Sequence, residues 1–147
     1  MSQEEVVWID PRDKPGLLRA VMEEYAADSK ISFEGDLKGL SFCTWLDATH
    51  GETSSLKRQT KEPELDFVVL PLNPSTYPGI WKELIEKDHL VNEGIIHVQI
   101  EMDGKLLFGG YDNFHRECTV AYSGIQQDFL EKLKRKGIIR GYQKKCS

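Results

Sequence analysis

The sequence lacks the long apolar runs that mark membrane proteins. Its uninterrupted apolar stretches, such as FVVL at 67–70, fall far below the roughly 20 residues that a membrane-spanning helix needs. The first ten residues, MSQEEVVWID, are acidic and contain no long apolar stretch, which argues against a secretory signal. We therefore expect a soluble, cytoplasmic protein with no membrane segment.

Cysteine is scarce. The three cysteines, Cys43, Cys118 and Cys146, are widely spaced, and no C-x-x-C motif occurs. An odd number of dispersed cysteines argues against a disulfide framework and fits a reducing compartment. His115 lies close to Cys118, but a zinc site needs three or four ligands and usually a second close pair. The sequence therefore predicts neither a metal site nor another cofactor.

The common catalytic signatures are missing as well. The chain contains no phosphate-binding loop of the G-x-x-x-x-G-K-S/T or G-x-G-x-x-G type, no nucleophile elbow and no H-E-x-x-H. Gly109 and Gly110 fall late in a predicted strand, where glycine more often marks a bulge or a close backbone approach than a phosphate site. These absences argue against the common enzyme classes, and we expect no catalytic residue.

What is present is the composition of an ordinary globular protein. Hydrophobic residues make up 39% of the chain and aromatic residues 10%, which argues against wholesale disorder. A chain of 147 residues is long enough to bury about two-thirds of its unfolded surface. Because no repeat or low-complexity tract divides it, we expect a single globular domain over residues 1–147.

Charge is distributed unevenly along the chain. Residues 132–147 hold seven basic residues and no acid, so that residues 1–131 hold 12 basic and 24 acidic residues, a net charge of −12. An acidic body repels nucleic acid and membrane surfaces and attracts basic partners. The basic end carries Tyr142 as its sole aromatic residue, too few for a platform that stacks nucleotides. The pattern favours a basic protein as partner, and disfavours nucleic acid.

Apolar periodicity predicts an alternation of strands and helices. Strands are expected at 6–10, 30–36, 40–47, 65–72, 93–114 as a hairpin, 117–122 and 138–142. Helices are expected at 16–28, 80–91 and 124–136, the last with Ser123 as N-cap and Gly137 just past its end. The segments 30–36 and 40–47 are expected to pair, and 65–72 to be a central strand. This order predicts an α+β fold with a mainly antiparallel or mixed sheet of six to seven strands and about three helices on one side.

Residues 47–64, DATHGETSSLKRQTKEPE, form the most unusual segment. They are polar, and Leu56 is their only large apolar residue. A loop this long in a small domain is either mobile or functional. We expect an extended polar loop here, and a contact element for a partner is one interpretation of it.

The hairpin turn sets an expectation for the neighbouring side chains. Asp103 and Gly104 are typical of a type I′ turn. If that turn fixes the register, His97 lies opposite Gly110 and diagonal to Asp112 on the same face of the sheet.

Four residues near this end of the sheet are the candidate ligand-binding residues: His97, Tyr111, Asp112 and His115. A neighbouring carboxylate can orient an imidazole for base chemistry. The competing interpretation is a packed histidine beside a polar turn, in which Asp112 bonds the backbone.

Two functions remain open. One is a small acidic protein-binding module, such as an inhibitor or immunity-like protein that docks on a basic partner. The alternative is a small-molecule-binding protein or an enzyme with a pocket at the sheet end. The acidic body, the missing catalytic motifs and the long polar loop favour the first.

Overall fold

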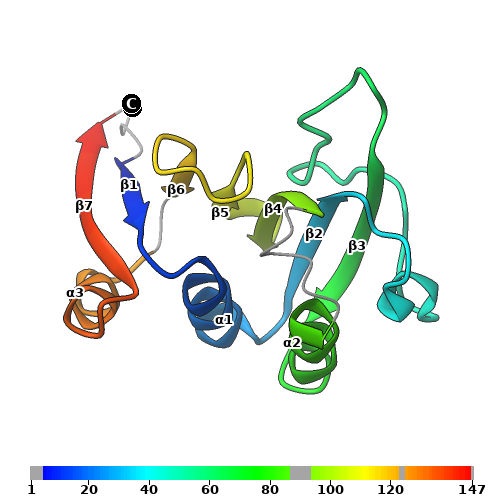
Figure 1. Cartoon of the computed structure of the whole chain (residues 1–147), viewed down its shortest axis with the longest axis horizontal. Helices are drawn as coiled ribbons and strands as arrows, with labels where there is room; N and C mark the ends of the chain where they lie inside the picture. The colour runs from blue at the N-terminus through cyan, green and yellow to red at the C-terminus, as the bar shows by residue number, and fades with distance from the viewer. Residues whose placement is uncertain (1–4, 87–93, 123–124, 147) are drawn as a thin grey trace.

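The computed structural model describes residues 5–86, 94–122 and 125–146. Over these residues, seven strands form one sheet and three helices pack on it (Figure 1). The strands are β1 (Glu5–Pro11), β2 (Ser29–Gly35), β3 (Asp66–Leu72), β4 (Ile95–Met102), β5 (Lys105–Gly110), β6 (Thr119–Ala121) and β7 (Ile139–Cys146). The helices are α1 (Lys14–Tyr25), α2 (Tyr77–Glu86) and α3 (Gln127–Arg135), and η1 (Ser41–Thr44) is a 3₁₀ helix.

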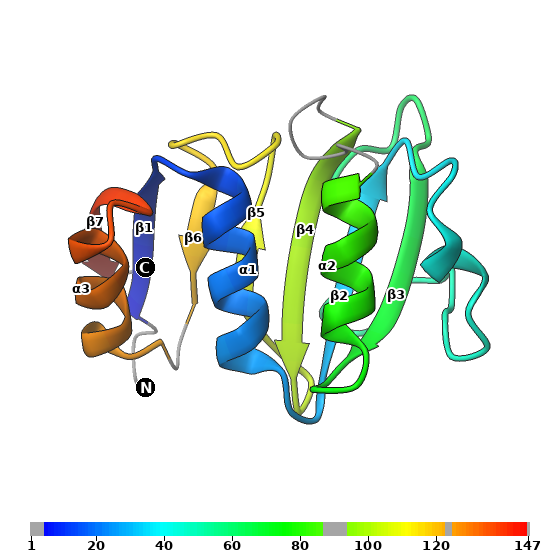
Figure 2. The same ribbon diagram turned by 60° about the horizontal axis from the view of Figure 1, so that its bottom comes forward.

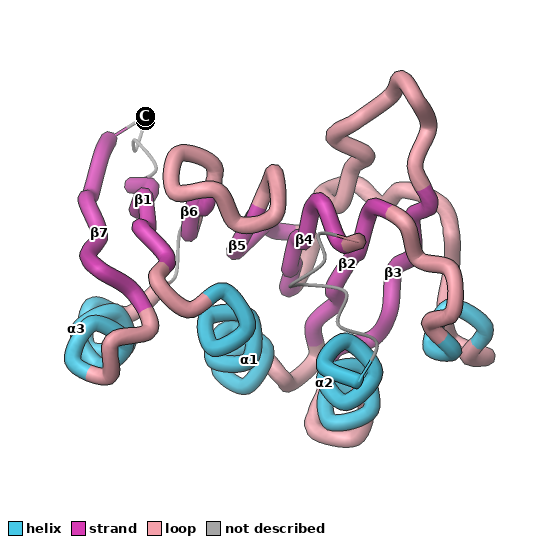
Figure 3. Tube along the Cα trace, in the orientation of Figure 1, coloured by secondary structure: helices cyan, strands magenta, loops and turns pink. Residues whose placement is uncertain are grey.

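All neighbouring strands run antiparallel, in the order β3-β2-β4-β5-β6-β1-β7. The three helices lie side by side on one face of the sheet, with α1 between α2 and α3 (Figure 2). The second half of the β2–β3 connection and the β5–β6 connection lie on the opposite side (Figures 1 and 3), whereas η1, in the first half of the β2–β3 connection, lies beside α2. The predicted α+β fold, with an antiparallel sheet and its helices on one side, is confirmed.

The main core lies between the helices and the sheet. Alternation along the strands turns Ile31 and Phe33 of β2 towards the helices, together with Val98 and Ile100 of β4, and all four are fully buried. The helices meet them with apolar stripes at helical spacing. The buried stripe of α1 consists of Leu17, Leu18, Val21, Met22 and Tyr25.

Local signals in the sequence fix the helix ends. The carboxylate of Asp13 accepts the N–H of Gly16 at 3.0 Å and caps α1. At the end of α3, Gly137 is left-handed with φ of 74°, and the N–H of Ile138 donates to the Leu133 carbonyl at 3.0 Å. This Schellman arrangement confirms the predicted C-terminal glycine.

Two predicted helix boundaries reach residues that lie outside the described part of the chain. Ser123, the predicted N-cap of the last helix, is one of them, and the described N-cap of α3 is Gln126. The end of the predicted helix 80–91 also lies outside it, because the structure describes α2 as far as Glu86.

The opposite face of the sheet carries a second, smaller core. Leu56 is fully buried there, against Phe67 and Val69 of β3, with Leu106 of β5 at its margin. Residues 47–64, which we call the strap, contribute Leu56 to this cluster. The one large apolar residue of the predicted loop therefore attaches the strap to the sheet.

The segment 40–47 is not a strand, and its predicted pairing with 30–36 is wrong. Phe42 is fully buried, and Trp45, three residues on, packs against α2. This spacing suits a 3₁₀ turn rather than a strand, whose side chains alternate. Glu83 of α2 accepts the first two N–H groups of η1 and stabilises the turn.

The segment 65–72 is a strand, as predicted, but it lies at the edge of the sheet. Its apolar run is continuous because both faces of β3 are covered, by the helix layer on one side and by Leu56 on the other. Its outer edge is partly closed by Thr49, which exchanges two backbone hydrogen bonds with Val69, at 3.0 and 2.7 Å.

Strands β4 and β5 form the predicted hairpin, but in a different register. The turn residues 103 and 104 have φ of 54° and 74°, as a type I′ turn requires. An irregularity after Ile100 shifts the pairing, so that Gly110 faces Val98 and not His97.

We expect Leu56→Ala to lower the free energy of unfolding by about 2–5 kcal/mol, because it leaves a cavity between the strap and the sheet. Leu46→Ala is the matched control: Leu46 is 99% exposed, and the change should stay within about 0.5 kcal/mol. Denaturant unfolding monitored by fluorescence measures both. Equal stabilities of the two variants would contradict the strap's attachment.

Candidate functional site

A row of polar side chains lies beneath the strap, on the face of the sheet away from the helices. It consists of Glu34 on β2 and His97, Gln99 and Glu101 on β4, and all four are buried. Their spacing along β4 turns them to one face. Because a buried polar group is costly without a hydrogen bond, the partners of this polar row define what it does.

Glu34 binds the backbone of the strap. Its carboxylate, in a residue only 1% exposed, accepts the N–H groups of Gln59 and Thr60 at 2.8 and 3.2 Å. Hydrogen bonds to a charged acceptor contribute about 1.5–3 kcal/mol each. Glu34 therefore fixes the strap at a defined height along β2.

His97 faces Glu34 directly across the two strands and bonds with both of its ring nitrogens. The N–H of Asp112 donates to Nδ1 at 3.2 Å, so Nδ1 is an acceptor and the proton of the neutral ring is on Nε2. Nε2 then donates to the hydroxyl oxygen of Thr60 at 2.8 Å. Burial lowers the pKa of His97. The negative charges of Glu34 and Asp112 favour the protonated ring and raise the pKa, but by less than burial lowers it.

Gln99 connects the strap to a pair of tyrosines. Its side-chain oxygen accepts the N–H of Lys57, and its nitrogen donates to the Tyr111 hydroxyl, both at 3.2 Å. The Tyr111 hydroxyl also meets that of Tyr122 at 3.2 Å, and burial, followed by this contact, raises the pKa of Tyr122. Glu101 completes the polar row by accepting the Thr53 hydroxyl at 2.8 Å.

The turn that carries Tyr111 depends on two glycines. A Cβ on Gly109 would lie 2.4 Å from the Tyr111 hydroxyl, and one on Gly110 would lie 2.6 Å from the Phe114 ring. The adjacent glycines therefore admit one aromatic ring on each face of β5, a close approach rather than a phosphate site. Residues 112–114 follow with three positive φ angles of 51°, 56° and 57°.

The structure brings together three of the four predicted site residues. His97, Tyr111 and Asp112 are in contact, with the His97 and Tyr111 rings 5.9 Å apart. Asp112 meets the imidazole through its N–H, while its exposed carboxylate accepts the Cys118 thiol at 3.5 Å. His115 is exposed, and its Nδ1 accepts the N–H of Glu117 at 3.1 Å.

Glu34, Gln99 and Glu101 were not among the site residues predicted from the sequence. A signal was present, because His97, Gln99 and Glu101 alternate with apolar residues, and a strand with polar residues on one face is ordinarily solvated there. That these side chains are buried depends on the strap, whose position no local pattern specifies.

The structure also places the potential metal-ligating and thiol side chains. Within the described residues, no group of three or more His, Cys, Asp or Glu side chains is arranged to hold a metal ion. Cys118 is half-buried, and burial and the Asp112 carboxylate raise its pKa, which disfavours the reactive thiolate. No helix of the described part of the chain is long and apolar enough to cross a membrane.

Three of the surface cavities lined by described residues contain none of the predicted site residues. One, of about 310 Å³, lies at the strand ends beside Glu101. A second, of about 290 Å³, lies beside Cys43 and Asp66. The third, of about 280 Å³, separates α1 from α3. Comparison with family models, curated proteins and solved structures finds no match to this chain.

We expect the His97 imidazole to titrate below the ordinary histidine pKa of about 6.5, because burial disfavours the charged ring. The stability that neutral His97 contributes is complete above that ordinary value and is lost as the pH falls through the lowered, folded-state pKa. Glu34→Gln should lower the midpoint further, since it removes a carboxylate that favours the imidazolium.

Imidazole NMR signals followed between pH 4 and 8 give these midpoints, with Glu117→Gln as the control for an exposed carboxylate. A His97 midpoint at or above the ordinary value, or one that Glu34→Gln raises, would contradict the contacts described for the ring.

Proposed function

We propose that the chain is an acidic protein-binding module that docks on a basic partner through a turn at the β3 edge of the sheet. Residues 45–48, which we call the Leu46 turn, carry the contact. The observation behind this proposal is Leu46, which is 99% exposed although Trp45 before it and Ala48 after it pack against the core. A partner that covers Leu46 removes a large apolar side chain from water.

The Leu46 turn is fixed on both sides. At its start, Trp45 packs edge-on against the buried ring of Phe42, with ring centroids 6.1 Å apart. Across it, the N–H of Ala48 donates to the Trp45 carbonyl at 3.0 Å, which leaves Leu46 and Asp47 at the tip. A side chain presented by a fixed backbone loses little conformational entropy on binding, which favours an anchor role.

Carboxylates lie at the tip of the turn and near its start. Asp47 is exposed beside Leu46. Burial raises the pKa of the nearby Cys43 thiol to about 11, and the charges of Glu83 and Asp66 add to the shift. An apolar anchor with a carboxylate directly beside it suits a partner that places a basic group next to an apolar pocket.

The net charge of residues 1–131 supports the same partner. At −12, it accelerates encounter with a basic surface and repels phosphate backbones. An inhibitor or immunity-like protein that covers a basic surface of a cytoplasmic partner fits this profile.

The alternative, a ligand pocket at the sheet end, receives less support from the contacts there. Both nitrogens of His97 are engaged by Thr60 and Asp112, which leaves neither free to bind a ligand or accept a proton. The imidazole thus serves to hold the strap and the 111–114 turn.

We expect Leu46→Asp to abolish capture of the partner from a lysate of the source organism. An apolar anchor of this kind contributes about 2 kcal/mol or more, and an added charge beside Asp47 opposes the partner's pocket further. Affinity capture with purified protein as bait, read out by mass spectrometry at low and moderate salt, measures the effect.

Gln143→Asp is the matched control, because it adds the same charge to an exposed residue of β7, at the opposite edge of the sheet. It should leave capture intact. The proposal fails if no protein is captured by the wild type, or if Leu46→Asp captures the same protein as well as Gln143→Asp does. A captured partner whose binding is insensitive to salt would refute the electrostatic part.

A further inference from the structure

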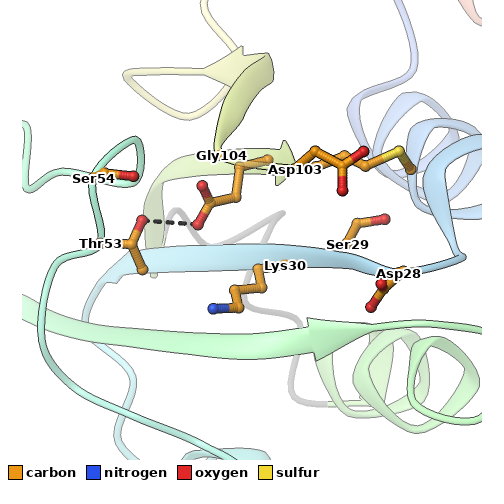
Figure 4. Close-up of a pocket in the computed structure, with 9 residues that line it drawn as sticks. Asp28, Ser29, Lys30, Thr53, Ser54, Asp103 and Gly104 are labelled. Carbon is orange, nitrogen blue, oxygen red and sulfur yellow. Dashed lines mark hydrogen bonds between the residues drawn. The ribbon is translucent and has the colours of Figure 1, made fainter.

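A cavity of about 310 Å³ opens where β2 and β4 meet the strap, at the end of the sheet that carries the 103–104 turn. Figure 4 shows its lining, which comes from the start of β2, from the strap and from the hairpin. The polar residues that matter here are Asp28, Lys30, Thr53, Glu101 and Asp103.

Glu101 is the unusual group in this cavity. It is 5% exposed, and its single side-chain hydrogen bond to the described residues is the one that Thr53 donates to Oε1 at 2.8 Å, drawn as the dashed line in Figure 4. Its second oxygen, Oε2, has no donor, and Glu101 has no ion pair, among the described residues. Glu34, by contrast, accepts two backbone N–H groups.

Oε2 keeps access to solvent, because the Tyr25 hydroxyl is the one fully buried side-chain polar atom without a partner among the described residues. A cation that enters the cavity can therefore reach this oxygen and pair with its charge. Thr53 offers nothing further: its hydroxyl hydrogen goes to Glu101, and its oxygen accepts the N–H groups of Ser55 and Leu56 at 3.3 and 2.9 Å. Lys30 pairs with Glu101 across the strands, but its exposed ammonium lies beyond 4.0 Å of that carboxylate.

The mouth of the cavity is negatively charged, like Glu101 inside it. Asp28 and Asp103 are exposed beside it, so its lining holds three carboxylates against the one ammonium of Lys30. Such a lining concentrates cations. Within the described residues no metal-binding group of side chains includes Glu101, which leaves organic cations as the better match.

We propose that this cavity binds a primary ammonium group at the end of an alkyl chain, with Glu101 as its counterion. An ammonium has three donors and no acceptor, which matches a site that offers carboxylate oxygens. An ammonium fits better than a guanidinium, which binds both oxygens of a carboxylate at once. Thr53 already donates to Oε1 of Glu101, so only Oε2 is left for a ligand. The ammonium belongs either to a free small amine or to a lysine side chain of another protein, and the site is independent of the Leu46 turn.

Two matched pairs of probes test this proposal on the full chain. One pair is pentylamine and pentanol, and the other is an acetylated and amidated Gly-Lys-Gly peptide and its norleucine counterpart. Backbone amide NMR spectra of the labelled protein are followed as each probe is added. We expect saturable shifts at residues 28–30, 53–54 and 101–104 with at least one ammonium probe, and none with the neutral probes.

Which ammonium probe saturates distinguishes the sources. Binding of pentylamine at least as tight as the lysine peptide identifies a small-amine site, and binding of the lysine peptide alone identifies a socket for a partner's lysine. Both results support the proposal.

Glu101→Gln tests the counterion, because it keeps the shape and the acceptor for Thr53 but removes the charge. We expect it to weaken binding of the ammonium probe by about tenfold or more. Glu117→Gln, an exposed carboxylate on the 111–118 turn, should leave the affinity unchanged. If Glu101→Gln does not fold, Asp28→Asn and Asp103→Asn, both at the exposed mouth, should each weaken binding severalfold instead.

The proposal is overturned if no ammonium probe gives saturable shifts in these residues, or if the neutral probes bind equally well. It is also overturned if Glu101→Gln folds and binds as the wild type does, or if calcium or magnesium chloride saturates the same residues while the amines do not.

Discussion

The structure depends on a row of buried polar side chains that holds a polar strap against the sheet. Glu34, His97, Gln99 and Glu101 each bind residues 53–60, and three of the bonds go to backbone N–H groups. Apolar side chains in their place could bury the same face, but they would not select which strap atom meets which strand. The polar row thus gives residues 47–64 one conformation where their composition alone predicts a loose loop.

Several other features follow from the position of the strap. Leu56 is buried only because the strap crosses β3, and Thr49 reaches Val69 to close part of an otherwise open edge. The Leu46 turn, which leads into the strap, leaves Leu46 exposed at its tip, while Thr53 within the strap donates one hydroxyl to Glu101. The two proposed contacts, at the Leu46 turn and at the Glu101 cavity, therefore lie at different places along one ordered segment.

The sequence predicted what depends on local pattern. The helix stripes, the turn at 103–104 and the C-terminal Gly137 were correct, because each follows from spacing or from a residue's own backbone preference. The prediction of a strand at 40–47 was wrong, because the few apolar residues of this segment do not distinguish a 3₁₀ turn from a strand. The predicted register of the hairpin was wrong, because no residue in the sequence indicates the shift after Ile100. The proximity of His97 to Asp112 was predicted, but the polar row was not, since its burial requires a strap distant in sequence.

The most direct test is the hydrogen exchange of strap amides under native conditions. The N–H groups of Lys57, Gln59 and Thr60 donate to Gln99 and Glu34, so they should exchange slowly, at rates approaching those of β4. Ser54, whose N–H has no acceptor among the described residues, should exchange fast. If all four amides exchange at the rate of an unstructured peptide, the polar row does not hold the strap, and the account of this fold is wrong.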